Sequence, residues 1–286
     1  MTQGNATIRD IIAARKNVYQ HLSPTPLYNY PSLTELLGTN TWIKHENHHP
    51  VGAFKVRGGL NLAANLTYEE KSNGLFTAST GNHGLSIAYA AKAYNIKATI
   101  AVPEEANPGK VAAMRALGAD VLFHGADFDE AREWIQSIAK KKGGKFVGPT
   151  DELLIYGVGT YALEILEELP SVDTIIVPVG AGSGVCGTGL VAKTINKEIE
   201  IIAVQSAQAP AMKLSWDSGT MVEAEMNTFA EGLATRVPFE STQKMMREYV
   251  DDFILVDDDD IKSALLILLE HTHNLVEEAA AAPFHP

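Results

Sequence analysis

The chain has 286 residues, of which 45% are hydrophobic and 20% charged, as expected for an ordinary soluble globular protein with a substantial core. The net charge of −12 argues against nucleic acid or an anionic membrane as the main partner, and there is neither an apolar run of membrane-spanning length nor an N-terminal signal peptide. The single cysteine, Cys186, excludes an internal disulfide and favours a reducing cytoplasm.

Short apolar runs typical of strands alternate with helix-like runs along most of the chain. Strands separated by helices indicate parallel sheets that are covered on both faces, so the predicted fold class is α/β. The strands are expected at 41–44, 75–78, 98–102, 120–123, 145–147, 174–179, 199–204 and 252–256. Helices with ordinary start and stop signals are expected at 84–94, 108–117 and 127–142.

The block at 75–147 is a βαβαβα run that is able to form a sheet of its own, while the flanking parts would build a larger one. Four consecutive acids at 257–260 precede the apolar residues of another expected helix. They are interpreted as a solvated helix start, because negative charge is favourable at the positive end of the helix dipole, rather than as a metal site.

Lys55 is the first candidate for a functional residue. It follows the aromatic Phe54 and precedes a glycine pair at 58 and 59. A lysine that is kept from bulk water loses its proton more easily, and the free amine is able to attack a carbonyl group. The alternative is an ordinary amphipathic lysine with its head in solvent, and only further segments decide between the two.

A second segment, Ser79-Thr80-Gly81-Asn82-His83-Gly84, connects a predicted strand to a predicted helix. Main-chain N–H groups at such a helix start are able to bind a carboxylate, and the Asn82 amide is able to hydrogen-bond a ring hydroxyl. A simple helix cap by Ser79 or Thr80 is the alternative. Two glycines and an asparagine are more than a cap requires, so the ligand interpretation is preferred.

The third segment follows the predicted strand at 174–179 and has glycine at 180, 182, 184 and 187. Glycines there allow the main chain to approach a phosphate at the start of the next helix. The spacing also matches a dinucleotide fingerprint, which requires an acid at the end of the following strand. That position is Gln205, so a phosphate site is preferred. A reactive lysine, a carboxylate turn and a phosphate turn together describe a site for pyridoxal phosphate.

The chain resembles the fold-type II pyridoxal phosphate enzymes, in particular their threonine/serine dehydratase and serine racemase branch, over nearly its whole length. The resemblance is carried by Thr25-Pro26-Leu27, Lys44-His45-Glu46-Asn47, Gly52-Ala53-Phe54-Lys55-Val56-Arg57-Gly58, residues 79–84, 118–119, 157–160, 177–180 and 230–232, and Glu277. It implies two domains with the active site in the cleft between them. Residues 1–73 and 148–286 would form the large cofactor-binding domain, and 74–147 the small mobile one.

The resemblance also implies residue roles. Lys55 would form the Schiff base and act as general base, with Phe54 near the cofactor ring and Asn82 at its phenolic oxygen. The substrate carboxylate would lie on the turn of Ser79, Thr80, Gly81, Asn82 and His83. The remaining cofactor-binding residues would be Gly180, Ala181, Gly182, Ser183 and Gly184 at the phosphate, and Glu277.

The implied reaction is that of a cytoplasmic ammonia-lyase of amino-acid catabolism, which converts L-threonine or L-serine into 2-oxobutanoate or pyruvate plus ammonia. The implied partners are a small amino-acid substrate and a second copy of the chain in a homodimer. Two alternatives stay open. One is an amino-acid racemase, or a lyase for another β-hydroxy amino acid such as 3-hydroxyaspartate. The other is a truncated, weakly active paralogue that acts as a cofactor-binding partner subunit.

The chain departs from the family's pattern at three places. Gln205 and Ala211 stand where many members carry carboxylates that bind a cation, so no metal is expected. Thr80 stands where racemases carry a catalytic serine, which makes it a candidate second acid/base. The chain also ends at Pro286, before the family's usual final helix and strand, so an exposed sheet edge and weakened activity are expected.

Overall fold

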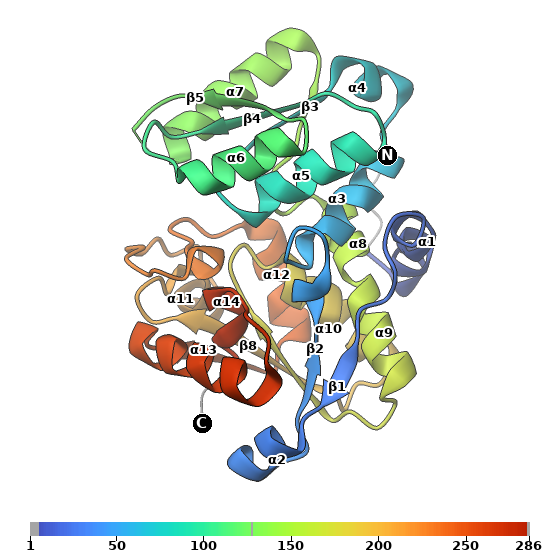
Figure 1. The fold of residues 1–286 in the computed structure, drawn as a ribbon, viewed down its shortest axis with the longest axis vertical. Coiled ribbons are helices and arrows are strands. Elements are labelled where there is room, and N and C mark those ends of the chain that lie inside the picture. The colour runs from blue at the N-terminus through green and yellow to red at the C-terminus, as the bar shows by residue number, and fades with distance from the viewer. Residues whose placement is uncertain (1–5, 127, 285–286) are drawn as a thin grey trace. The chain divides into compact units, whose positions relative to one another are not determined.

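The computed structural model of the chain describes residues 6–126 and 128–284, and helices and strands alternate along it (Figure 1). The chain forms two compact units. Unit 1 contains the residues up to Arg9, Pro24–His48 and the residues from Gly159 onward, and unit 2 contains Asp10–Ser23 and His49–Val158. These boundaries assign more of the chain to the second unit than expected. Whether 74–147 moves as a domain by itself stays a prediction.

Unit 2 is built on a parallel four-stranded sheet in the order β5-β4-β3-β6. Leu75 pairs with Ala98 on one side and with Lys145 on the other, which fixes the register. The strands are β3 (Leu75–Ala78), β4 (Ala98–Val102), β5 (Asp120–Phe123) and β6 (Lys145–Phe146). The prediction that 75–147 forms its own parallel sheet is therefore confirmed.

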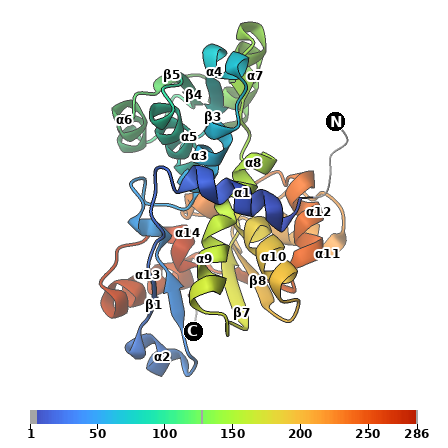
Figure 2. The same cartoon turned by 90° about the vertical axis from the view of Figure 1, so that its right-hand side faces the viewer.

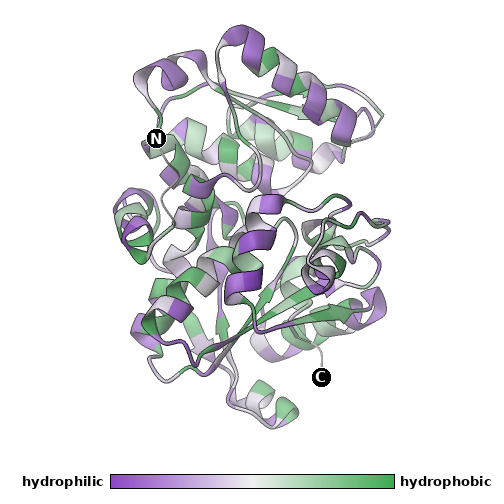
Figure 3. Cartoon of the chain, turned by 180° about the vertical axis from the view of Figure 1, so that it is seen from behind, coloured by the Kyte–Doolittle hydropathy of each residue, from purple (hydrophilic) through white to green (hydrophobic). Residues whose placement is uncertain are grey.

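Alternation along the strands of unit 2 gives the sheet two apolar faces. Leu75 and Ile100 point into the core that is shared with α5 (Asn82–Ala93) and α6 (Pro108–Ala116). Phe76 and Ala101 point the opposite way, into a core with α7 (Phe128–Lys142). In Figure 3 the chain is coloured by hydropathy, and α7 is mainly purple with some green positions. The buried residues of this helix are Ala131, Ile135 and Ala139.

Three helices of unit 2 pack unusually closely because glycines line their contacts. A Cβ added to Gly58 on α3 (Lys55–Ala64) would lie 2.8 Å from the Leu154 carbonyl oxygen on α8 (Glu152–Val158), and one on Gly59 would lie 2.7 Å from the Ser86 carbonyl oxygen on α5. Gly157 on α8 likewise contacts the main chain of Arg57. The glycine pair after Lys55 therefore lies inside α3 and allows close helix packing.

The other helices of unit 2 are α4 (Tyr68–Asn73) and most of α1 (Ile8–Val18). The start of α4 is a capping box, in which the Thr67 hydroxyl accepts from the Glu70 N–H and the Glu70 carboxylate accepts from the Thr67 N–H. The predicted helix start at Asp127 lies outside the described residues, and α7 begins at Phe128.

Unit 1 has a parallel sheet in the order β7-β8-β9, with Thr174 paired to Glu200 and Ile202 paired to Asp252. Its strands are β7 (Thr174–Pro178), β8 (Glu200–Ser206) and β9 (Asp252–Val256). Figure 2 shows α9 (Thr160–Glu168) and α10 (Ser183–Ile195) on one side of β7 and β8, and α13 (Asp258–Thr272) with α14 (Glu278–Ala281) on the other. Buried residues of β8, β9, α13 and α14 form one apolar core.

The remaining elements of unit 1 lie around this sheet. They are α2 (Pro31–Leu37), η1 (Glu46–His48), α11 (Ala211–Ser218), η2 (Glu231–Leu233) and α12 (Glu240–Tyr249). A small sheet pairs β1 (Leu27–Asn29) with β2 (Trp42–Lys44) in antiparallel fashion. The sequence predicted β2 but not β1, and it predicted no antiparallel pair, because a half-exposed strand of three residues has too few apolar positions to be recognised.

A buried ion pair connects Thr25 and Lys44, two residues of the family's motifs, to Glu164 in unit 1. Lys44 Nζ lies 2.6 Å from Glu164 Oε2 on α9, and their side chains are 8% and 4% exposed. Lys44 also donates to the Thr25 carbonyl at 2.6 Å, while the Thr25 N–H donates to Glu164. The pair is thus hydrogen-bonded on both sides, as burial of two charges requires. Among the helices of residues 6–126 and 128–284, none combines the length and the apolar composition of a membrane span.

Candidate active site

Lys55 is the first residue of α3 and is half-buried. Its main-chain carbonyl accepts a 2.6 Å hydrogen bond from Ser86 Oγ on α5, and Gly59 keeps the two helices in close contact. Lys55 Nζ lies 4.8 Å from the centroid of the Phe54 ring, within the range of a cation–π contact. The position of the lysine is therefore set by α5, the helix that follows the predicted carboxylate turn.

The turn of residues 79–83 connects β3 to α5 as predicted. Gly81 is the N-cap of α5 and has no side chain that could cap the first amides of the helix. Instead, Ser79 Oγ accepts from the Gly81 N–H at 3.2 Å and shapes the turn. Thr80, Gly81 and Asn82 are half-buried. Uncapped amides at the positive end of a helix suit the carboxylate of a small ligand.

His83 is buried behind this turn. Its Nε2 lies 3.2 Å from the Val147 carbonyl, so the neutral ring donates from Nε2. Burial and, to a smaller extent, the positive charge of Lys55 lower the pKa of His83 from 6.5 to about 4, against the opposing effect of the hydrogen bond to Val147. His83 is therefore neutral, and its hydrogen bond to Val147 supports the turn from behind. Lys55 and the predicted carboxylate turn both belong to unit 2.

The glycine turn of unit 1 leads from β7 into α10, also as predicted. Gly182 has a φ of 99°, which favours glycine, and a Cβ there would lie 2.8 Å from Thr242 Cβ. A Cβ on Gly180 would collide with the Gly232 carbonyl oxygen. Thr242 Oγ1 donates to the Ala181 carbonyl at 2.8 Å. The turn is therefore held from two directions and has no room for side chains at these glycines.

This turn fits a phosphate group. The first amides of α10, at Ser183 and Gly184, follow an N-cap glycine that cannot satisfy them with a side chain. A phosphate held by these amides would meet the positive end of a 13-residue helix. The residues present thus match the group that the resemblance implies.

Glu277 lies near the same turn. It is the N-cap of α14, and a Cβ added to Gly232 would lie 3.8 Å from Glu277 Oε1 and 2.6 Å from Ala279 Cβ. Because Gly232 in turn contacts Gly180, the predicted cofactor residues 180–184 and Glu277 lie on neighbouring segments of unit 1. The sequence did not reveal that Gly232 forms this connection, although 230–232 belongs to the family's motifs.

Sequence reasoning missed the residues that support the two turns. Thr242 lies 61 positions from Ala181, and Ser86 lies 31 positions from Lys55, so no local pattern connects them.

Cys186 packs beneath the glycine turn, where its thiol contacts the Thr242 carbonyl at 3.6 Å. Complete burial raises the pKa of the Cys186 thiol far above its usual value, which keeps it from acting as a nucleophile.

Gln205 is fully buried at the end of β8. Its Oε1 accepts from the Lys213 N–H at 3.2 Å, and its Nε2 lies 3.5 Å from the Leu233 carbonyl. The amide thus connects β8 to α11 and η2. Within the part of the chain that the structure describes, no three His, Cys, Asp or Glu side chains are grouped so that they could hold a metal ion.

The chain resembles known proteins in both sequence and structure. It is 37% identical to the L-threonine ammonia-lyase of Thermotoga maritima, over 96% of this chain and 69% of that protein. It is 35% identical to a biosynthetic L-threonine dehydratase of Haemophilus influenzae, over 96% of this chain but 54% of that one. The chain thus spans about half to two thirds of the length of these relatives.

Solved structures give the same picture. A processed form of threonine deaminase isoform 2 from Solanum lycopersicum matches with a TM-score of 0.92 and 34% identity, covering 96% of this chain and 80% of that one. Maize serine racemase matches with a TM-score of 0.94 and 31% identity, covering 98% and 87%. The fold is therefore the two-domain α/β fold of these enzymes, as predicted.

The family of pyridoxal-phosphate-dependent enzymes matches residues 18–285, which is nearly the whole chain. Both candidate turns, Lys55 and Glu277 fall inside this match. Together with the relatives and the uncapped amides of the glycine turn, the match gives the identity of the family. The chain belongs to the pyridoxal-phosphate-dependent enzymes.

Proposed function

We propose that this protein is a pyridoxal-phosphate-dependent ammonia-lyase that converts L-threonine, L-serine or both into 2-oxobutanoate or pyruvate plus ammonia. The relatives named threonine ammonia-lyase or threonine dehydratase support this reaction class. The observation that carries the proposal is the fixed relation of Lys55 to α5. A lysine and an amide-rich turn on one rigid pair of helices suit an amino acid that must react and be held by its carboxylate.

Lys55 would hold the cofactor covalently and then act as the base at the substrate Cα. The bound cofactor supplies an electron sink for the negative charge that develops at this carbon. The turn of residues 79–83 would hold the substrate carboxylate at the start of α5, and the amide of Asn82 would hydrogen-bond the cofactor's phenolic oxygen. Phe54 would limit access of water to the amine. A drier site makes the neutral amine more available.

In unit 1, the amides of Gly180, Ala181, Gly182, Ser183 and Gly184 would hold the phosphate. Glu277 would lie at the edge of the cofactor site, next to Gly232. These roles use groups that the fold has already oriented, since Thr242 and Gly232 fix the turn. Fixed amides lose little freedom when an anion binds, which favours tight binding.

The test is a panel of amino acids with separate read-outs for ammonia and 2-oxo acid, run on the wild type and on Lys55→Ala with added pyridoxal phosphate. Equal amounts of ammonia and 2-oxo acid from threonine or serine, absent in Lys55→Ala, are expected. Cofactor binding without turnover of any amino acid would contradict the lyase and favour the partner-subunit alternative.

A racemase is the second candidate, and Thr80 is the observation that favours it. Thr80 is half-buried and lies on the carboxylate turn, where its hydroxyl would serve as a second acid/base at the opposite face of Cα. The likeness to maize serine racemase also supports this candidate. Chiral chromatography of the same incubations decides: D-serine without ammonia would establish racemisation, and Thr80→Ala should abolish it while the lyase reaction persists.

Assembly, location and domain motion are further parts of the proposal. We propose a homodimer, because members of the family are commonly dimers. Light scattering of the purified protein tests this assembly. A cytoplasmic location is supported by the single cysteine in 286 residues. Residues 74–147 would move as a small domain over the substrate, so amide hydrogen exchange in this range should slow when threonine binds.

A further inference from the structure

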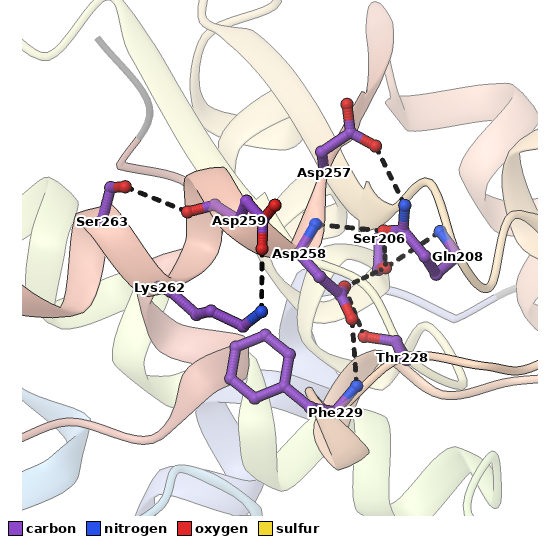
Figure 4. Close-up of polar contacts among 9 residues, drawn as sticks. All are labelled: Ser206, Gln208, Thr228, Phe229, Asp257, Asp258, Asp259, Lys262 and Ser263. Carbon is purple, nitrogen blue, oxygen red and sulfur yellow. Dashed lines mark hydrogen bonds and ion pairs between the residues drawn. The ribbon is translucent and has the colours of Figure 1, made fainter.

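The carboxylate of Asp258, at the start of α13, accepts hydrogen bonds from the end of β8 and from residues 228–229 (Figure 4). Its Oδ1 accepts from Ser206 Oγ and from Thr228 Oγ1, both at 2.7 Å, and its Oδ2 accepts from the Phe229 N–H at 3.1 Å. The acidic run therefore does more than start a helix in solvent. The predicted solvated helix start holds for Asp259, whose side chain is 90% exposed and pairs with Lys262.

Gln208 fixes Asp258 from the other side. Its Oε1 accepts from the Asp258 N–H at 3.0 Å, and its Nε2 donates to Asp257 Oδ1 at 2.9 Å (Figure 4). The Gln208 N–H donates to Ser206 Oγ at 3.1 Å. The main chain and the carboxylate of Asp258 are thus both tied to the carboxyl end of β8, so the carboxylate has little freedom to move.

The segment that Asp258 holds is the one that contacts the glycine turn. Thr228 Oγ1 accepts from the Ala230 N–H at 3.1 Å, and the Ala230 carbonyl accepts from the Leu233 N–H at 2.8 Å, which forms η2. The carbonyl of Gly232, within η2, lies directly against Gly180. A continuous path of hydrogen bonds and main chain therefore runs from Asp258 to the first residue of the phosphate turn.

We propose that Asp258 is a positioning residue for the phosphate of the cofactor. It acts through Thr228 and Phe229, which place η2 against Gly180 and so orient the amides of the turn. The inference rests on the proposed role of residues 180–184. Hydrogen bonds to a carboxylate are stronger than those between neutral groups, so this contact is suited to hold a segment in one position.

The test compares the affinity for pyridoxal phosphate with that for pyridoxal, which lacks the phosphate. Both are measured by titration of the purified protein with absorbance and fluorescence read-outs. Asp258→Asn and Thr228→Val should each weaken pyridoxal phosphate about tenfold or more, as expected for loss of a hydrogen bond to a charged group, and change pyridoxal by less than about twofold. Thr228→Ser retains the hydroxyl and should bind both like the wild type.

Asp259→Asn is the matched control, because it removes the same charge one residue further on from an exposed side chain. It should leave both affinities unchanged. A general loss of folding would weaken both ligands together, so an equal loss of pyridoxal and pyridoxal phosphate in Asp258→Asn and Thr228→Val would overturn the inference. Unchanged affinities in these two variants would overturn it as well. A wild type that binds neither ligand would instead refute the proposed function.

Discussion

The hydroxyl of Ser86 donates a 2.6 Å hydrogen bond to the main-chain carbonyl of Lys55, and so joins the start of α3 to the middle of α5. Because α5 begins at the carboxylate turn, this bond sets the distance between the reactive amine and the turn that would hold the substrate. Gly59 allows the approach, since any side chain there would collide with Ser86.

Ser86→Ala should therefore impair the reaction more than it impairs folding. Loss of this part-buried hydrogen bond should cost about 0.5–1.5 kcal/mol of unfolding free energy. We expect kcat/KM for threonine to fall by about tenfold or more, since small displacements of a catalytic group are costly. Denaturant melts and steady-state assays check both effects. Ser263→Ala, which removes an exposed hydroxyl bond on α13, should change neither quantity.

Gly180→Ala should abolish cofactor binding. The added Cβ collides with the main-chain carbonyl of Gly232, and a backbone atom cannot rotate away as a side chain would. Either the turn or η2 must move, and the amides that would hold the phosphate move with them. Titration with pyridoxal phosphate measures the loss. Gly148→Ala, where the nearest atom lies 4.0 Å away, should bind like the wild type, and equal binding by both variants would contradict this reading.

The burial of neutral His83 should make stability depend on pH. Its pKa in the folded chain is about 4, below the ordinary value of 6.5. Between these values the unfolded chain binds more protons than the folded one, so the free energy of unfolding falls as the pH falls through this window and is unaffected above it. The full loss amounts to about 3 kcal/mol.

Urea melts of the wild type and of His83→Gln at several pH values between 4 and 7 isolate this effect. Other groups titrate in both proteins, so only the difference between them reports on His83. The wild type should lose more stability than His83→Gln on acidification. Parallel curves for the two proteins would mean that the imidazole does not become buried in its neutral form.

Cys186 should resist alkylation in the folded protein. The thiolate is the reactive form, and burial raises the pKa of this thiol and excludes the reagent. Iodoacetamide at pH 8 should modify Cys186 only after denaturant is added, as mass spectrometry of the intact chain will show. Rapid modification of the native protein, together with loss of cofactor binding, would show that the thiol beneath the glycine turn is exposed.

The sequence predicted the strands well where apolar residues form an uninterrupted run. The predictions for Leu75–Ala78, Ala98–Val102, Asp120–Phe123 and Asp252–Val256 coincide with the strands of the structure. The strands β3 and β4 are buried along their whole length, and burial on both faces leaves a clear apolar signal. The strands β5 and β9 are only partly buried, but each has an apolar run after its first aspartate. The three residues of β1 lack this signal, since their burial differs from one residue to the next.

The two turns were also recognisable from sequence, because glycines next to strand ends and helix starts form a local pattern. Their supports were not, since Ser86, Thr242 and Asp258 act on residues more than a helix length away in the chain. Asp258 was even assigned to solvent on the basis of its three acidic neighbours. Whether a carboxylate in such a run is exposed depends on which distant donors the fold brings to it.

The central claim is that the amine of Lys55 carries the cofactor. The purified protein is incubated with pyridoxal phosphate, reduced with borohydride, digested and analysed by mass spectrometry. A pyridoxyl-phosphate adduct on Lys55, and none in Lys55→Ala, is the result that we expect. Wild-type protein whose Lys55 stays unmodified, while another lysine carries the adduct or none does, would contradict the account.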